Sequence, residues 1–148
     1  MNVGQICSRN VASLPASAPL HDVARLMHDR HVGAIVLTRA PLDQPVPVGM
    51  ITDRDIVRAQ LDRAADLTRI RAEDVMSREP LVLNEHEPVD EAIAKLRRRG
   101  VRRAPVVDQH GALVGLISSD DLIAETAREL GALANALQRE PCHEGERV

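Results

Sequence analysis

The sequence contains no Phe, Tyr or Trp, and only two of its 148 residues are cysteines. Without aromatic side chains the core must be aliphatic, and no base-stacking surface of the kind that binds single-stranded nucleic acid can form. Cys7 and Cys142 form neither a CxxC motif nor a disulfide framework, so a reducing compartment is expected. No apolar run approaches the roughly 20 residues needed to cross a bilayer. We therefore predict a cytoplasmic protein without a membrane partner.

The chain also lacks a strong charge of either sign. Its 19 basic and 22 acidic residues give a formal net charge of -3, so no global field attracts nucleic acid or an anionic membrane. Apolar residues make up 44% and charged residues 28%, which is typical of a globular domain. The length suits one domain, or two small halves that share a core.

An internal repeat organises the sequence. A shift of 69 residues aligns residues 6–9 with residues 75–78, and the match continues into the next apolar segment. Three extra loop residues within 40–47 reduce the shift to 66, after which residues 49–57 match residues 115–123. The two halves are therefore expected to share one structure.

Each half has the pattern of an amphipathic helix followed by strands. Apolar residues at 20, 23, 24 and 27, and at 89, 92, 93 and 96, have helical spacing, and Pro19 and Pro88 stand where a helix can begin. Buried strands are expected at residues 33–38 and 104–107.

The next segment of each half, residues 49–57 and 115–123, is predicted to be a strand that ends in Thr or Ser and continues into a helix. The pattern predicts the order β-α-β-β-α for each half, in fold class α+β. The last helix is expected to end near Gln138, before Pro141. A half of about 60 residues is marginal alone, so the pair is expected to fold as one unit. The predicted divisions are residues 1–62 and 74–130 for the two domains, 63–73 for the linker, and 131–148 for the helix end and a polar tail.

Thr52 and Asp55, with their counterparts Ser118 and Asp121, carry the clearest chemical signal. A hydroxyl followed three residues later by an acid, just before a helical run, is typical of a capping box. The same geometry suits a nucleotide, because a helix N-terminus offers N–H groups to phosphate and the carboxylate can accept both hydroxyls of a ribose. The residues alone leave both interpretations open.

A tandem repeat of this kind, with halves that end in Gly-Met-Ile-Thr-Asp-Arg-Asp-Ile and Gly-Leu-Ile-Ser-Ser-Asp-Asp-Leu, resembles a pair of CBS (cystathionine β-synthase) domains. Residues 101–108, Val-Arg-Arg-Ala-Pro-Val-Val-Asp, are similar to the family's middle strand. The resemblance covers about residues 3–130. It implies a stand-alone Bateman-type module of two repeats that are related by a pseudo-two-fold axis. Such a module has two clefts that bind adenosine-containing nucleotides, and through this binding it regulates another protein.

The resemblance also implies roles for individual residues. It makes Asp55 and Asp121 the ribose ligands, and Thr52 and Ser118 the phosphate contacts. The further ligand-binding candidates are neighbours of these residues and apolar positions that would form walls for adenine: Arg54, Ser119, Ala12, Ser13, Ile35, Val36, Leu81, Val82, Ala104 and Pro105.

The two halves differ at one pair of positions. Arg102 and Arg103 match basic positions that face the nucleotide phosphates in many family members, and a planar guanidinium suits phosphate oxygens. The first half has Gly33 and Ala34 there, so the clefts are expected to differ in affinity. Replacing Asp121 is expected to weaken nucleotide binding at least tenfold, and replacing the acid of the first half to a different extent.

The sequence therefore favours a non-enzymatic module that binds AMP, ADP or ATP, with S-adenosylmethionine or a dinucleotide as further candidates, and that signals to an unidentified partner protein. No Ser-His-Asp ordering, Gly-rich phosphate loop or HExxH motif is present, and no cofactor is expected to be required. His21, His28 and His31 have no carboxylate or thiolate partner at a suitable spacing, so no metal site is predicted.

Two rival functions come from other features. A ligand-free scaffold or dimerisation module is the first alternative, since the threonine and serine would then only cap helices. Nucleic-acid binding through the arginines of residues 97–103 is the second, and it is not favoured because residues 97–99 point in successive directions around a helix. The apolar stripe that continues to Leu137 predicts a homodimer with helix-to-helix contacts.

Overall fold

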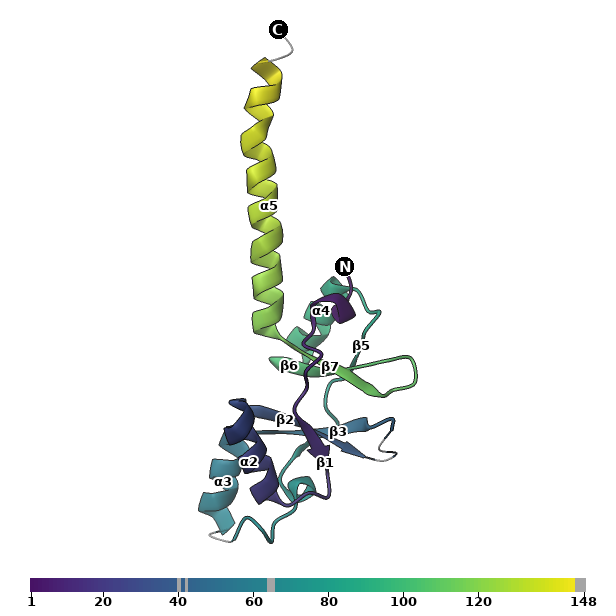
Figure 1. Ribbon diagram of the computed structural model, residues 1–148, viewed down its shortest axis with the longest axis vertical. Helices are drawn as coiled ribbons and strands as arrows, with labels where there is room; N and C mark the ends of the chain where they lie inside the picture. The colour runs from purple at the N-terminus through teal and green to yellow at the C-terminus, as the bar shows by residue number, and fades with distance from the viewer. Residues whose placement is uncertain (40, 42, 64–65, 146–148) are drawn as a thin grey trace.

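The computed structural model describes residues 1–39, 41, 43–63 and 66–145. Residues 64 and 65 of the expected linker, two residues of the Pro-rich loop, and residues 146–148 of the expected tail lie outside the described residues. Two small sheets face each other at the centre, with helices on their outer sides (Figure 1). The elements of the first half are α1 (Val3–Ile6), β1 (Ser13–Pro15), α2 (Leu20–Arg30), β2 (Ala34–Arg39), β3 (Val46–Thr52) and α3 (Asp53–Arg63).

The second half repeats this order, so the predicted α+β fold of two β-α-β-β-α repeats is confirmed. In each half, the strand that precedes the first long helix pairs in parallel with the strand that follows it, and the latter strand pairs antiparallel with the next one. The elements of the second half are η1 (Ala72–Asp74), β4 (Ser77–Arg78), β5 (Leu83–Asn84), α4 (Val89–Arg99), β6 (Arg103–Val107), β7 (Leu113–Ser118) and α5 (Ser119–Gly145). The sheet orders are β1-β2-β3-β4 and β5-β6-β7.

Matching residues begin and end the first long helix of each repeat. Pro19 and Pro88 occupy the N-cap positions of α2 and α4, with φ of -60° and -62°. At the other end, His31 and Gly100 adopt the left-handed conformation that closes a helix, with φ of 53° and 64°. Glycine adopts this conformation without the steric cost that a Cβ adds at His31.

The core is aliphatic, as the absence of aromatic residues requires. It has two clusters, one under each sheet. Leu20, Ile35 and Ile51 are fully buried in the first cluster, and Leu83 and Ile117 are fully buried in the second. Burying each such side chain stabilises the fold by about 1.5–3 kcal/mol.

Each repeat completes its core with a segment from the other half. Val3 of α1 is buried in the second cluster, and Ser8 bridges to Leu116 on β7. Correspondingly, Ala72 of η1 is buried in the first cluster, and β4 pairs with β3 in the first sheet. Neither repeat therefore has a complete core alone, which agrees with the expectation that the pair folds as one unit.

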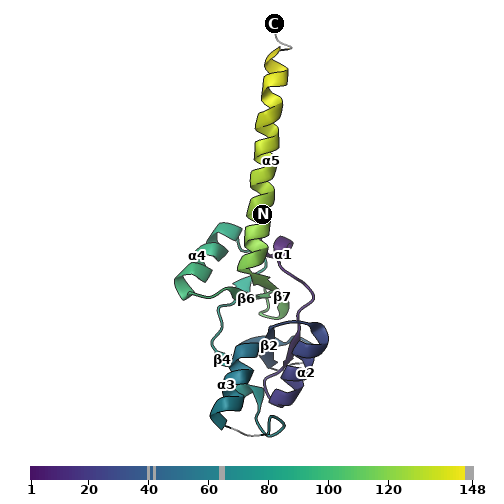
Figure 2. The ribbon, with the colours of Figure 1, turned by 90° about the vertical axis from the view of Figure 1, so that its left-hand side faces the viewer.

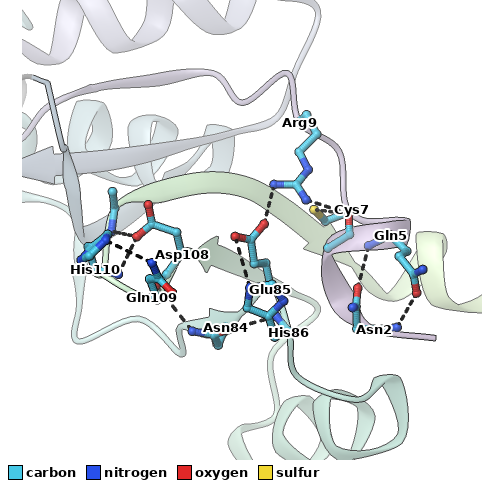
Figure 3. Close-up of polar contacts among 12 residues, drawn as sticks. Asn2, Gln5, Cys7, Arg9, Asn84, Glu85, His86, Asp108, Gln109 and His110 are labelled. Atoms are coloured by element: carbon cyan, nitrogen blue, oxygen red, sulfur yellow. Dashed lines mark hydrogen bonds and ion pairs between the residues drawn. The ribbon is translucent and has the colours of Figure 1, made fainter.

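The N-terminal segment is also attached to the second repeat by polar contacts (Figure 3). Arg9 Nη1 lies 3.0 Å from Glu85 Oε2 of the second repeat, while Arg9 Nη2 donates to the carbonyl of Gly4 within its own segment at 3.0 Å. On the other side of the molecule, the expected linker packs Ile70 into the core of the first repeat. The segment between the repeats is thus partly a structural element of the first one.

The last helix is longer than predicted. The expected end near Gln138 is wrong, because α5 continues through Pro141 to Gly145. A proline inside a helix removes one hydrogen bond and crowds the carbonyl of the preceding turn, at a cost of about 3 kcal/mol, which the high helix propensity of the preceding Leu- and Ala-rich turns opposes. Most of α5 projects away from both sheets as a single helix (Figures 1 and 2). In the described part of the chain, no helix is both long and apolar enough to cross a membrane.

Candidate functional site

Two clefts lie between the repeats, and they correspond to each other under the sequence repeat. We call the first the Asp55 cleft. It has a volume of about 350 Å³ and joins the β3–α3 junction of the first repeat to two segments of the second. Its lining residues are Met50, Thr52, Asp55, Ser77, Arg78, Glu79, Pro80, Leu81, Arg99, Val101, Arg102 and Arg103.

The second cleft, the Asp121 cleft, has a volume of about 280 Å³. It joins the β7–α5 junction of the second repeat to two segments of the first. Nearly every lining position is the repeat counterpart of a position in the Asp55 cleft. Its lining residues are Ser8, Asn10, Val11, Ala12, Val32, Gly33, Ala34, Arg103, Leu116, Ser118 and Asp121.

The acidic residue of each cleft belongs to a capping box. The backbone N–H of Thr52 donates to Asp55 Oδ2 at 2.9 Å, and the N–H of Asp55 donates to Thr52 Oγ1 at 3.4 Å. In the second repeat the N–H and the hydroxyl of Ser118 both donate to Asp121 Oδ2 at 2.9 Å. The capping interpretation is therefore present in the structure. It uses only Oδ2 of each carboxylate, and an ionised carboxylate can accept further hydrogen bonds.

Each cleft combines the carboxylate of one repeat with the middle segment of the other. Arg102 belongs to the same repeat as Asp121, yet it lines the Asp55 cleft. Gly33 lines the Asp121 cleft. The difference that the sequence shows at these positions therefore makes the Asp55 cleft the arginine-rich one.

Sequence reasoning missed two further arginines of this cleft, Arg78 and Arg99. Both are fixed on backbone carbonyls, since Arg78 Nη2 donates to the carbonyl of Glu73 at 3.0 Å and Arg99 Nη2 to that of Glu79 at 2.7 Å. The repeat held a signal for them, because both positions are also arginine in the first half. In contrast, the contact that the described residues give Arg102 is a solvent-exposed ion pair at 3.9 Å with Asp120, which contributes little.

Several predicted site residues lie outside both clefts. Ile35, Val36, Ala104 and Pro105 are buried at the centres of β2 and β6, so a ligand in a cleft cannot reach their side chains. The remaining predicted residues that line neither cleft are Arg54, Ser13, Val82 and Ser119. Among the residues that the structure describes, no group of three or more His, Cys, Asp and Glu side chains could hold a metal ion.

The family of the chain follows from its sequence match. Residues 3–62 and 72–128 match the family model described as "CBS domain", once for each repeat. The chain belongs to the CBS domain family. The predicted pair of CBS repeats is thereby confirmed.

Relatives and solved structures agree with this family. An uncharacterised protein of Methanopyrus kandleri is 27% identical over 123 residues, which make up 83% of this chain and 61% of that protein. The chain thus spans less than two thirds of that relative's length. The structure of a CBS domain protein from Pyrobaculum aerophilum, complexed with AMP, is 32% identical, covers 90% of this chain and 99% of its own, and has a TM-score of 0.74.

A second solved structure shares the fold. It is the CBS domain pair of protein MJ0100, complexed with 5′-methylthioadenosine and S-adenosyl-L-methionine. It is 22% identical, covers 87% of this chain and 98% of its own, and has a TM-score of 0.73. Adenosyl ligands of different charge are therefore found on this fold.

Proposed function

We propose that this chain is a regulatory module that binds an adenine nucleotide in the Asp55 cleft and signals its occupancy to a partner protein. The observation that carries the proposal is the composition of that cleft, which is lined both by a carboxylate at a helix N-terminus and by four arginines. The Pyrobaculum relative, complexed with AMP, supports it. The role is one of ligand sensing and not of catalysis.

The chemistry of the cleft suits the three parts of a nucleotide. The N-terminus of α3 and the Thr52 hydroxyl can donate to a phosphate, while Asp55 can accept from the ribose hydroxyls. Guanidinium groups bind phosphate oxygens in pairs. In the absence of aromatic residues, aliphatic side chains such as Leu81 and Val101 would contact the adenine.

The arginines also select among adenosyl ligands. A guanidinium attracts phosphate and repels the sulfonium and amino groups of S-adenosylmethionine. We therefore expect AMP, ADP or ATP in this cleft, in preference to S-adenosylmethionine. Among its described lining residues the Asp121 cleft has one arginine, so a ligand with less negative charge suits it better.

Calorimetric titration with AMP, ADP, ATP and S-adenosylmethionine tests the proposal, with GMP as a matched control for the base. At 100 times its dissociation constant, the preferred nucleotide should raise the free energy of unfolding by about 2.7 kcal/mol through mass action on the native state. A melting temperature unchanged by every adenosyl ligand would refute nucleotide binding. It would leave the scaffold function in its place.

We also propose that the module forms a homodimer through the exposed apolar side of α4 and α5. A groove of about 540 Å³ runs between these helices, and Leu130, Leu133 and Leu137 on α5 are each more than half exposed. A lone projecting helix is marginal in water, so burial against a second copy would stabilise it. Two copies would together bury six such leucines, each contributing on the order of 1–2 kcal/mol, which is comparable to the cost of association.

Light scattering at tens of micromolar tests the dimer. Leu133→Glu places a charge on the apolar side of α5 and should convert a dimer into a monomer. Asn135→Glu places the same charge on the opposite side of the helix and should leave the mass unchanged. A monomer mass for the wild-type chain would refute the proposal.

A further inference from the structure

Arg103 is the one residue, among those the structure describes, that lines both clefts. It is the first residue of β6 and lies opposite Ser118 of β7 in the sheet register. Its repeat counterpart is Ala34, which lies opposite Thr52 and lines the Asp121 cleft only. Position 103 thus lines the Asp55 cleft, as the repeat predicts, and it lines the Asp121 cleft as well.

The guanidinium of Arg103 is not committed to a protein partner. Its side chain is exposed, and within the described part of the chain no hydrogen bond or ion pair holds it. Arg78 and Arg99 differ in this respect, because backbone carbonyls fix them within the Asp55 cleft. Of the arginines that the structure describes, Arg103 is thus the one that lines both clefts and has a guanidinium available to a ligand.

The two clefts depend on this cation to different degrees. Of the described residues that line the Asp121 cleft, Arg103 alone is basic, and Asp121 supplies a negative charge. The Asp55 cleft keeps Arg78, Arg99 and Arg102 when Arg103 points elsewhere. Losing this guanidinium would thus leave the Asp121 cleft with a net negative lining, which repels an anion.

We propose that the two clefts share Arg103, so that a phosphate bound in the Asp55 cleft engages its guanidinium and lowers the affinity of the Asp121 cleft for a second anionic nucleotide. A guanidinium held by a bidentate contact with a phosphate in one cleft is positioned away from the other cleft, and its positive charge is compensated by that phosphate. The Asp121 cleft then favours an uncharged adenosyl ligand once the first nucleotide is bound. This inference rests on the proposed nucleotide site and assigns a regulatory coupling to it.

The coupling is measured with AMP as the probe. In the wild-type chain, the second AMP should bind at least tenfold more weakly than AMP binds to the Asp121 cleft of Asp55→Ala, where the first cleft is impaired and Arg103 is available. Asp55→Asn provides a second version of this comparison, because an amide oxygen can still accept from the Thr52 N–H and preserve the cap. Circular dichroism verifies the fold of each variant.

Arg103→Gln separates a shared cation from simple repulsion between two phosphates. If the cation is shared, the coupling disappears in Arg103→Gln. The affinity for the second AMP in this variant then equals the affinity of the Asp121 cleft for AMP in the double variant Arg103→Gln, Asp55→Ala. If the phosphates only repel each other, the coupling persists or increases in the variant. Arg102→Gln is the matched control, because Arg102 lines only the Asp55 cleft, and it should weaken the first AMP while retaining the coupling.

The number of AMP molecules bound and their affinities in the wild-type chain and in Asp55→Ala also test the proposal. One AMP bound to the wild-type chain and one bound to Asp55→Ala would support the sharing of Arg103 if adding Asp121→Ala to Asp55→Ala removed that binding, and would overturn it if the binding were unchanged, because AMP would then occupy the Asp55 cleft in both proteins. The proposal that the clefts share Arg103 would be overturned if the wild-type chain bound its second AMP as tightly as Asp55→Ala binds AMP. It would also be overturned if Asp55→Ala folded and bound no AMP. Failure of AMP to bind the wild-type chain at all would instead refute the proposed nucleotide site itself.

Discussion

Replacing the acid of each cleft by alanine separates capping from ligand binding. In the folded chain, Asp55 accepts the N–H of Thr52 and Asp121 accepts the N–H of Ser118, each at 2.9 Å. Losing a cap of this kind costs about 1 kcal/mol of folding stability. Because the two boxes have nearly the same geometry, Asp55→Ala and Asp121→Ala should reduce the free energy of unfolding by similar amounts.

Their effects on AMP affinity should differ. Removing a charge-assisted bond to a ribose hydroxyl costs about 1.5–3 kcal/mol, which is a tenfold to hundredfold loss of affinity. We expect this loss in the tight site for Asp55→Ala, since the Asp55 cleft has the arginines that bind phosphate. Asp121→Ala should leave the tight site within a few-fold of wild type. From the sequence we expected the tenfold loss of affinity for Asp121→Ala. With the structure we expect it for Asp55→Ala, because the arginines of the second repeat line the cleft that contains Asp55.

Calorimetric titration with AMP and urea unfolding of the same preparations distinguish the two effects. Equal losses of affinity in the tight site would refute the assignment of that site to one cleft. Lower stability with unchanged affinity in both variants would show that the acids only cap their helices.

The remaining predictions concern the fold. At Gly115 a Cβ would lie 2.6 Å from Cys7 Sγ and 3.0 Å from the Ser8 carbonyl, so Gly115→Ala should lower the urea midpoint by an amount equivalent to about 1–3 kcal/mol, and an unchanged midpoint would contradict this packing of the N-terminal segment on β7. Asp108 accepts the N–H of Ala112 at 3.0 Å within the turn drawn in Figure 3, and hydrogen bonds of this kind hold the pKa of its carboxyl below its usual value. The stabilisation from Asp108 is therefore present above the unfolded pKa of about 3.9 and is lost as the pH falls through the lower folded pKa. The stability difference between wild type and Asp108→Asn should accordingly be present above pH 5 and shrink in stronger acid, while a difference that persists unchanged in strong acid would contradict the assignment.

The sequence by itself determined the repeat, the element order and the capping boxes. These features depend on residues within a few positions of each other: the helical spacing after Pro19 and Pro88, and the hydroxyl and acid at Thr52 and Asp55. Such local patterns select helices and strands before any tertiary contact forms. The unequal number of arginines in the two repeats was equally visible in the sequence.

Only the tertiary structure decided which residues share a cleft. Arg102 joins Asp55 of the other repeat because each repeat packs its leading segment on its partner's sheet, as β4 does on β3. This contact joins residues far apart in the chain, and no local pattern specifies it. Burial acts in the same way, because both faces of β2 are covered and Ile35 belongs to the core. The position of a side chain in its own strand does not show whether another element covers it. Packing in the folded structure therefore decides whether the residue lines a cleft or belongs to the core.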